Sequence, residues 1–172
     1  PAAELPAVAL ATGAELVLRS AARGERTVAA GDFFEGYFTT ALADDEILTA
    51  VRFPVAAAGT GACFAEAARR HGDFAMVGVA ASLQLDGGTI ADARLALIGV
   101  SDVPVRVGEA EAELVGQAPT SAAFDAAVAA AVRGLTPPSD VHASAAYRRS
   151  VAGVLVRRAL DGAAAASGGN GK

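Results

Sequence analysis

The sequence predicts an α+β protein in which a three-stranded antiparallel sheet packs on a three-helix bundle. Three extended, apolar segments cover residues 62–69, 74–85 and 91–100, and helical patterns follow them. Strands grouped ahead of helices are typical of α+β domains. The turn Asp86-Gly87-Gly88 joins the last two strands, and short glycine-containing turns of this kind connect antiparallel neighbours.

The middle strand predicts which face of the sheet is buried. Apolar residues recur at every second position from Val77 to Leu85, and successive side chains on a strand point to opposite faces. The intervening positions hold the small or polar residues Gly78, Ala80, Ser82 and Gln84. We therefore expect one face in the core, and the other either in solvent or against a close neighbour.

Three helices are expected after the sheet. The first covers 109–115, and the second runs from a cap at Thr120 or Ser121 to Gly134. Hydroxyl residues are preferred at N-caps, and glycine is preferred just after a helix. The third helix begins at about Val141.

The third helix has an apolar stripe bordered by arginines. The stripe consists of Tyr147, Val151, Val154 and Leu155, at the spacing of one helix face. The arginines are Arg148, Arg149, Arg157 and Arg158. We expect these arginines on a solvated or partner-facing side of the helix. Residues 163–172 are mostly alanine, serine and glycine, and they are expected to form a disordered tail.

The N-terminal part of the chain has elements of its own. A short helix or turn is expected over 1–11, and strands over 15–19 and 25–29 form a hairpin. Asp32 is followed three residues later by Glu35, which resembles a capping box and predicts a short helix.

A further strand is expected over 46–53, where β-branched residues precede Pro54. Residues 55–61 are then rich in alanine, glycine and threonine, as linkers are. The sequence therefore predicts a first unit over 1–54, a linker over 55–61 and a second unit over 62–162.

Composition excludes several classes of protein. The chain has 14 Lys+Arg against 19 Asp+Glu and a net charge of −5, which argues against a nucleic-acid binder. Its 53% hydrophobic residues suffice for a packed core. No apolar stretch approaches the roughly 20 residues of a membrane span. Cys63 is the only cysteine, and with two distant histidines it cannot supply a zinc or iron–sulfur ligand set. We expect no bound metal and a reducing, cytoplasmic location.

The densest polar cluster is the segment Arg69-Arg70-His71-Gly72-Asp73 between two apolar strands. One interpretation is a solvated β-turn in which Gly72 takes a positive φ. The other is a ligand-facing loop, because paired arginines suit phosphate or carboxylate groups and a nearby aspartate can orient one of them. The spacing leaves both interpretations open.

Other candidate sites are weaker. Asp140, His142 and Ser144 are the residue types of a hydrolase triad, but positions i and i+2 of a helix point to different faces. We expect Asp140 to be a helix N-cap instead, and Cys63 to pack as a small apolar residue. The sequence contains no complete glycine-rich phosphate-binding motif.

Several strings occur in the order and spacing of a known family. They are PAAELP, GDFFEGYFTTAL, DDEILTAVRFP, FAEAARRHGDFAMVGVAASLQLDGGTI and SDVHASAAYRRSVAGVLVRRAL. To about Leu160 the chain resembles the medium, FAD-binding subunit of the xanthine dehydrogenase and aerobic carbon monoxide dehydrogenase family of molybdenum hydroxylases. The family's glycine-rich pyrophosphate loops fall before Pro1 in this register, so the resemblance implies the C-terminal portion of such a subunit.

The resemblance also implies a cofactor and a binding site. Residues 1–54 correspond to the tail of an FAD-binding subdomain, and 62–162 to the C-terminal α+β domain that closes over the flavin. The implied FAD-binding residues are Glu4, Leu48, Arg70, His71, Gly72, Asp73 and Phe74. Some members have lysine where this chain has Ala65 and Glu66. No catalytic residue and no metal ligand is implied in this chain.

The implied function is electron transfer, from iron–sulfur clusters to FAD and on to NAD, quinone or oxygen. The implied partners are a large subunit that binds molybdenum and molybdopterin and a small iron–sulfur subunit, in a hetero-oligomer. The alternative is a non-catalytic docking module whose arginine-bearing helix and apolar strands join the larger subunits. A free-standing hydrolase rests on Asp140, His142 and Ser144 alone.

Overall fold

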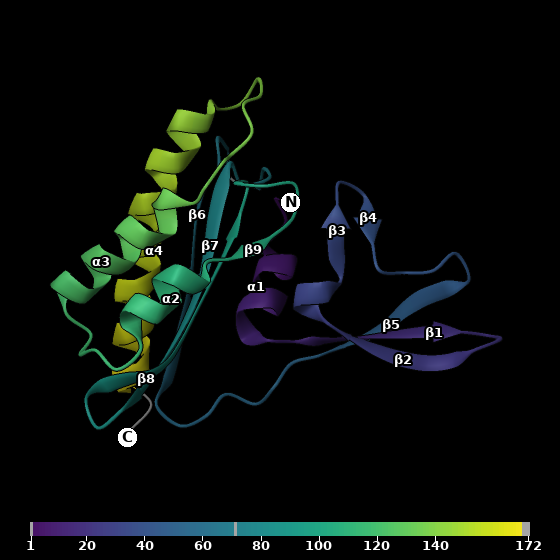
Figure 1. Cartoon of the computed structure of the whole chain (residues 1–172), viewed down its shortest axis with the longest axis horizontal. Coiled ribbons are helices and arrows are strands. Elements are labelled where there is room, and N and C mark those ends of the chain that lie inside the picture. The colour runs from purple at the N-terminus through teal and green to yellow at the C-terminus, as the bar shows by residue number, and fades with distance from the viewer. Residues whose placement is uncertain (1, 71, 170–172) are drawn as a thin grey trace.

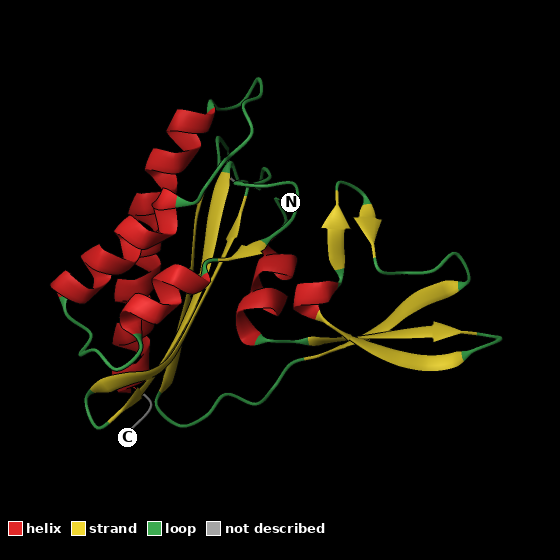
Figure 2. Cartoon of the chain, viewed as in Figure 1, coloured by secondary structure: helices red, strands yellow, loops and turns green. Residues whose placement is uncertain are grey.

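The computed structural model describes residues 2–70 and 72–169. Figure 1 shows a unit of sheet and helices beside a narrower arm of strands. The sheet of the unit is antiparallel and consists, in spatial order, of β6 (Thr60–Ala67), β7 (Val77–Asp86), β8 (Thr89–Ile98) and β9 (Val105–Arg106). The expected three-stranded meander is confirmed. The fourth strand pairs only two residues with β8 (Figure 2), too few for an alternating pattern in the sequence.

The expected three-helix layer is also confirmed. It consists of α2 (Gly108–Leu114), α3 (Ser121–Arg133) and α4 (Ala145–Gly169). The Thr120 side chain caps α3, since its Oγ1 accepts the backbone N–H of Ala123 at 3.3 Å. The three helices lie together on one face of the sheet. No helix in the described ranges is long and apolar enough to cross a membrane.

Helix α4 extends further than the sequence indicates. It continues to Gly169, so the expectation of disorder is wrong for 163–169, while 170–172 lie outside the described residues. Ala163 is fully buried, and Ser167 is also buried. At Gly61 of β6, an added Cβ would lie 2.0 Å from the Ala163 carbonyl oxygen. The last turns of α4 are therefore ordered by close packing on β6, which no local pattern in the tail reveals.

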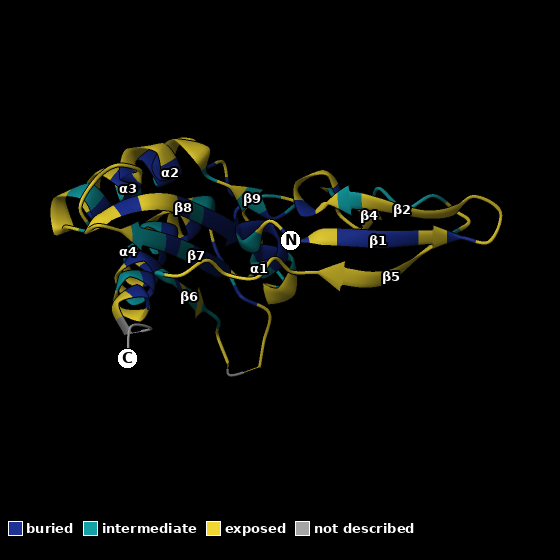
Figure 3. Cartoon of the chain, turned by 90° about the horizontal axis from the view of Figure 1, so that it is seen from below, coloured by how far each residue is buried: buried dark blue, intermediate teal, exposed yellow. Residues whose placement is uncertain are grey.

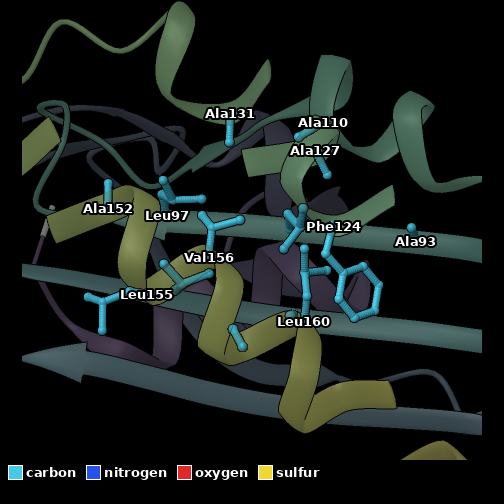
Figure 4. Close-up of a cluster of buried hydrophobic side chains, with 14 of the residues drawn as sticks. Ala93, Leu97, Ala110, Phe124, Ala127, Ala131, Ala152, Leu155, Val156 and Leu160 are labelled. Carbon is cyan, nitrogen blue, oxygen red and sulfur yellow. The ribbon is translucent and has the colours of Figure 1, made fainter. Parts of the chain in front are cut away.

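The main core lies between the sheet and these three helices. The alternating residues Val77, Val79, Ala81 and Leu83 are buried in it, which confirms the predicted core face of β7. Figure 4 shows side chains from α3 and α4, among them Phe124 and Leu160, meeting in this core. Each large apolar side chain buried here stabilises the fold by about 1.5–3 kcal/mol.

The opposite face of the sheet is covered by helix α1 (Glu4–Thr12). A second core joins Ala80, Ala96 and Ile98 of the sheet to Ala7 and Leu10 of α1. The structure thereby decides between solvent and a close neighbour for this face, because a helix packs on it. The alanines suit this face because larger side chains would keep the helix away. Gly78 gives room to the neighbouring Ile98 side chain, since an added Cβ would lie 2.8 Å from it.

The arm is a three-stranded antiparallel sheet in the order β2 (Gly24–Ala29), β1 (Glu15–Ser20) and β5 (Glu46–Arg52). The predicted hairpin and the predicted strand before Pro54 are both confirmed. The central strand β1 is mostly buried, whereas β2 and β5 are mostly exposed. The arm therefore presents two open strand edges.

The helix predicted to begin at Asp32 is wrong. The 3₁₀ turn η1 (Ala30–Asp32) ends there, and the chain continues into β3 (Phe34–Gly36), which pairs with β4 (Thr39–Thr40). Phe33 is buried in the second core, and its carbonyl accepts the Ala41 N–H at 2.9 Å. These contacts between distant residues override the local capping signal.

We predict that Gly61→Ala destabilises the fold by about 1–3 kcal/mol, the typical cost of overpacking, because the new methyl group meets the α4 backbone. Thermal unfolding measures the change. Gly134→Ala is the matched control, since a Cβ at Gly134 meets nothing within 4 Å and its φ is −88°. Equal melting temperatures for the two variants would contradict the observed α4 packing.

Candidate functional site

The charged segment identified in the sequence forms a bend between β6 and β7. Gly72 has a φ of 85°, and the Asp73 N–H donates to the Arg70 carbonyl at 3.2 Å, so the tip is the turn expected there. The Met76 N–H donates to the Ala67 carbonyl at 2.8 Å and closes the base. We call residues 68–76 the charged bend. In Figure 3 it projects on the same side of the molecule as β5.

A cleft of about 320 Å³ adjoins the charged bend. The bend lines it with Arg69, Asp73 and Phe74, and the N-terminal part of the chain lines it with Ala2 and Tyr37. The volume lies at the lower end of the roughly 300–1,000 Å³ that ligand pockets span. The cleft can therefore hold one ring system of a larger ligand. The two interpretations of the charged segment are thus combined, with a solvated tip and a base that faces a cleft.

The deepest charged side chain of this cleft is Arg148, whose side chain is 6% exposed. It projects from α4 and donates to the carbonyl oxygens of Met76 and of Gly99, the latter at 3.1 Å. Its Nη2 donates to an Asp140 carboxylate oxygen at 2.7 Å. The expectation that Arg148 lies on a solvated or partner-facing side is therefore wrong. Arg149 and Arg158 are exposed as expected.

Asp140 stabilises the turn that precedes α4. Its Oδ1 accepts the backbone N–H groups of His142 and Ala143, at 2.8 and 2.9 Å. These two bonds and the Arg148 guanidinium lower the pKa of Asp140 to about 2, because each favours the charged carboxylate. Among the described residues the Asp140 carboxylate accepts only from these groups, which does not favour a triad with the His142 imidazole.

The helix N-cap itself is Ser144, whose Oγ accepts the Tyr147 N–H at 3.2 Å. The prediction that Asp140 is the N-cap is therefore wrong, because the N-cap lies four residues later in the chain. The reason is that Asp140 caps the preceding turn, which delays the start of α4 to Ala145. Cys63 is partly buried against the main core, close to what the sequence predicts.

The site residues implied by the sequence lie at four places in the described part of the chain. Asp73 and Phe74 line the cleft, whereas Arg70 and Gly72 lie at the exposed tip of the bend. His71 lies outside the described residues. Glu4 is exposed in the first turn of α1, two residues after the cleft residue Ala2.

Leu48 lies on β5 and does not line the cleft. It pairs with the fully buried Leu18 of β1, so both side chains lie on one face of the arm. Leu48 is 42% exposed, which leaves part of its apolar surface open on that face.

Among the charged and aromatic residues that line the cleft, Tyr37 and Arg148 are not singled out as site residues by the sequence. Arg69 is part of the charged segment singled out there, although the family resemblance does not include it among the FAD-binding residues. Nothing in the sequence distinguishes Arg148 from Arg149, because both flank the apolar stripe of one helix. Only the position of the sheet end shows which of them points inward.

Two family domains match the chain. Residues 62–163 match the CO dehydrogenase flavoprotein C-terminal domain. The chain belongs to that flavoprotein family. Residues 1–56 match the FAD binding domain in molybdopterin dehydrogenase, so the resemblance drawn from the sequence strings is confirmed.

Relatives of this flavoprotein chain include the carbon monoxide dehydrogenase medium chain of Afipia carboxidovorans, which is 38% identical over 96% of this chain and 57% of the relative. The caffeine dehydrogenase subunit beta of a Pseudomonas species is 42% identical over 68% of this chain and 40% of the relative. The chain spans about half the length of most such relatives.

Solved structures show the same fold. Carbon monoxide dehydrogenase from Hydrogenophaga pseudoflava matches with a TM-score of 0.90 and 38% identity, over 94% of this chain and 56% of that one. Quinoline 2-oxidoreductase from Pseudomonas putida 86 matches with a TM-score of 0.88 and 36% identity, over 96% of this chain and 57% of that one.

The low pKa of Asp140 predicts a pH dependence of stability. A carboxylate with a lowered pKa stabilises the fold above its ordinary pKa of 3.8 and loses that contribution as the pH falls to about 2. We therefore expect Asp140→Asn to lower the melting temperature at pH 7, and the difference from the unmodified chain to shrink between pH 4 and pH 2. Thermal unfolding across this range measures it.

The control for the lost negative charge is Asp86→Asn, at the exposed end of β7. It removes a carboxylate that is remote from Arg148. A gap between Asp140→Asn and the unmodified chain that stays constant down to pH 2 would show that the Asp140 hydrogen bonds do not stabilise the fold.

Proposed function

We propose that this chain forms the C-terminal part of the FAD-binding medium subunit of a molybdenum hydroxylase, and that its cleft receives the isoalloxazine end of FAD. One observation carries the proposal. The cleft is lined both by residues of the region that matches an FAD-binding domain and by residues of the flavoprotein C-terminal domain. A ligand held between two such units is a common arrangement.

The lining of the cleft suits a flavin ring. Phe74 and Tyr37 offer exposed aromatic surfaces, against which a flat ring can stack. Arg69 and Asp73 bring opposite charges to the same cleft. Bound FAD accepts and releases electrons, and the protein tunes its electron affinity through nearby charge. In this proposal Arg69 favours the electron-rich ring, and Asp73 opposes it.

The remaining implied contacts belong to the same proposal. Glu4 and Leu48 approach FAD from the N-terminal part of the chain, and Arg70 and Gly72 from the bend. His71 is kept as a proposed FAD contact on the family resemblance alone. The family relationship supports electron delivery from iron–sulfur clusters, with release to NAD, quinone or oxygen. The proposed partners are a molybdenum-binding large subunit and an iron–sulfur small subunit. A docking role is compatible with this, since Ile47 and Phe53 of the arm region are exposed.

Residues 1–172 alone should bind FAD weakly, because a cleft of about 320 Å³ has room for the ring but not for the pyrophosphate and adenosine as well. Titration of FAD with protein, followed by quenching of flavin fluorescence, measures the affinity. A complete subunit of the family serves as the positive control. Binding by this chain as tight as by the control would contradict the proposed division of the site.

In the complete FAD-loaded subunit, Asp73→Asn should raise the flavin reduction potential, because it removes a negative charge that opposes electron uptake. A charge pair at about 4 Å interacts by about 1–4 kcal/mol in water or at a protein surface. For two electrons, about 1.4 kcal/mol corresponds to about 30 mV. Spectroelectrochemical titration measures the shift, and Asp86→Asn is the charge-matched control. An unchanged potential in Asp73→Asn would remove Asp73 from the flavin environment.

A further inference from the structure

We propose that Arg148 is a positioning residue that fixes the base of the charged bend, and thereby sets where Asp73 and Phe74 stand relative to the flavin. The inference rests on the proposed function for its flavin part. The hydrogen bonds by which Arg148 holds the Met76 and Gly99 carbonyl groups, which we call the clamp, lie within this chain.

The first element of the clamp is the residue at the base of the bend. Met76 is held on both sides of its backbone, since its N–H donates to the Ala67 carbonyl on β6 and its carbonyl accepts from Arg148 Nη1. Phe74 and Asp73 lie two and three residues before it. A fixed Met76 therefore restricts the positions that these two cleft residues can reach.

The second element is the close approach of two strand ends. Gly99 follows β8, has a φ of 75°, and approaches so closely that an added Cβ would lie 2.1 Å from the Met76 carbonyl oxygen. Arg148 donates to both the Met76 and the Gly99 carbonyl oxygens. The Gly99 carbonyl is buried and the Met76 carbonyl is partly buried. Carbonyl groups removed from water need a donor, and a guanidinium supplies several donors in a fixed plane.

The third element is the orientation of the guanidinium. Asp140 accepts from Nη2 at 2.7 Å and is itself held by two backbone N–H groups. This arrangement leaves the buried Nε of Arg148 without a partner among the described residues. The terminal nitrogens of Arg148 donate to three acceptors, which lie just before β7, just after β8 and just before α4.

Arg149 is a suitable comparison for Arg148. It is the next residue on the same helix, and its Nε and Nη2 both donate to the Leu135 carbonyl, at 3.1 and 2.7 Å. Its loss also removes arginine hydrogen bonds to the backbone. Arg149 does not line the cleft or contact the charged bend in the described residues. It therefore reports the effect of lost stability alone.

The first test uses the full chain without flavin. Arg148→Gln should speed amide hydrogen exchange in peptides covering residues 72–76 about tenfold or more, the effect expected from loss of a charge-assisted hydrogen bond. Arg149→Gln should leave this segment unchanged. Arg148→Lys, which keeps the charge but not the fork of donors, should fall between Arg148→Gln and the unmodified protein. Equal exchange in the Arg148 and Arg149 variants would overturn the clamp.

The second test uses the complete FAD-loaded subunit. Arg148→Gln should shift the flavin reduction potential, whereas Arg149→Gln should not. If Arg148→Gln does not fold, Arg148→Lys and Asp140→Asn are measured in its place. If Arg148→Gln speeds amide hydrogen exchange but leaves the flavin reduction potential unchanged, the positioning role is overturned, although Arg148 still holds the base of the bend. If Asp73→Asn and Arg148→Gln both leave the potential unchanged, the proposed flavin site itself is wrong.

Discussion

The burial of both faces of the β7–β8 pair is the constraint on which the rest of the structure depends. Val77 and Val79 pack against the three C-terminal helices, and Ala80 and Ala96 pack against α1. A sheet covered on one face only would leave α1 and the arm free to move. Because the second face is also buried, the N-terminal part of the chain has a fixed position beside the C-terminal unit, and the cleft between them has a defined shape.

The charged bend benefits from the same constraint. It connects two paired strands, β6 and β7, so both its ends are fixed by backbone hydrogen bonds, while Arg70 and Gly72 are exposed. A site built in this way combines a rigid base with charges that solvent can reach. The buried Arg148 extends the rigidity of the sheet to Met76, the last residue of the bend, and the turn held by Asp140 couples it to α4.

The elements that local patterns predict are those whose stabilising contacts are also local. The alternation along β7, the Thr120 cap and the Asp86-Gly87-Gly88 turn all act within a few residues, and the structure has each of them. The predicted helix at Asp32 fails because Phe33 is drawn into the second core. The predicted disorder of 163–169 fails because Gly61, about a hundred positions earlier, lets α4 close on β6.

The sequence by itself determined the fold class, the core face of the central strand and the family. Periodicity and the order of sequence strings can be recognised without knowing which distant residues are in contact. It also singled out the charged segment as a candidate site. Only the tertiary structure decided that α1 covers the second face of the sheet, that the base of the bend faces a cleft, and that Arg148 points inward while Arg149 is exposed. Arg148 and Arg149 are neighbours on one helix, but only Arg148 faces the ends of β7 and β8. No local sequence pattern encodes where those strand ends lie.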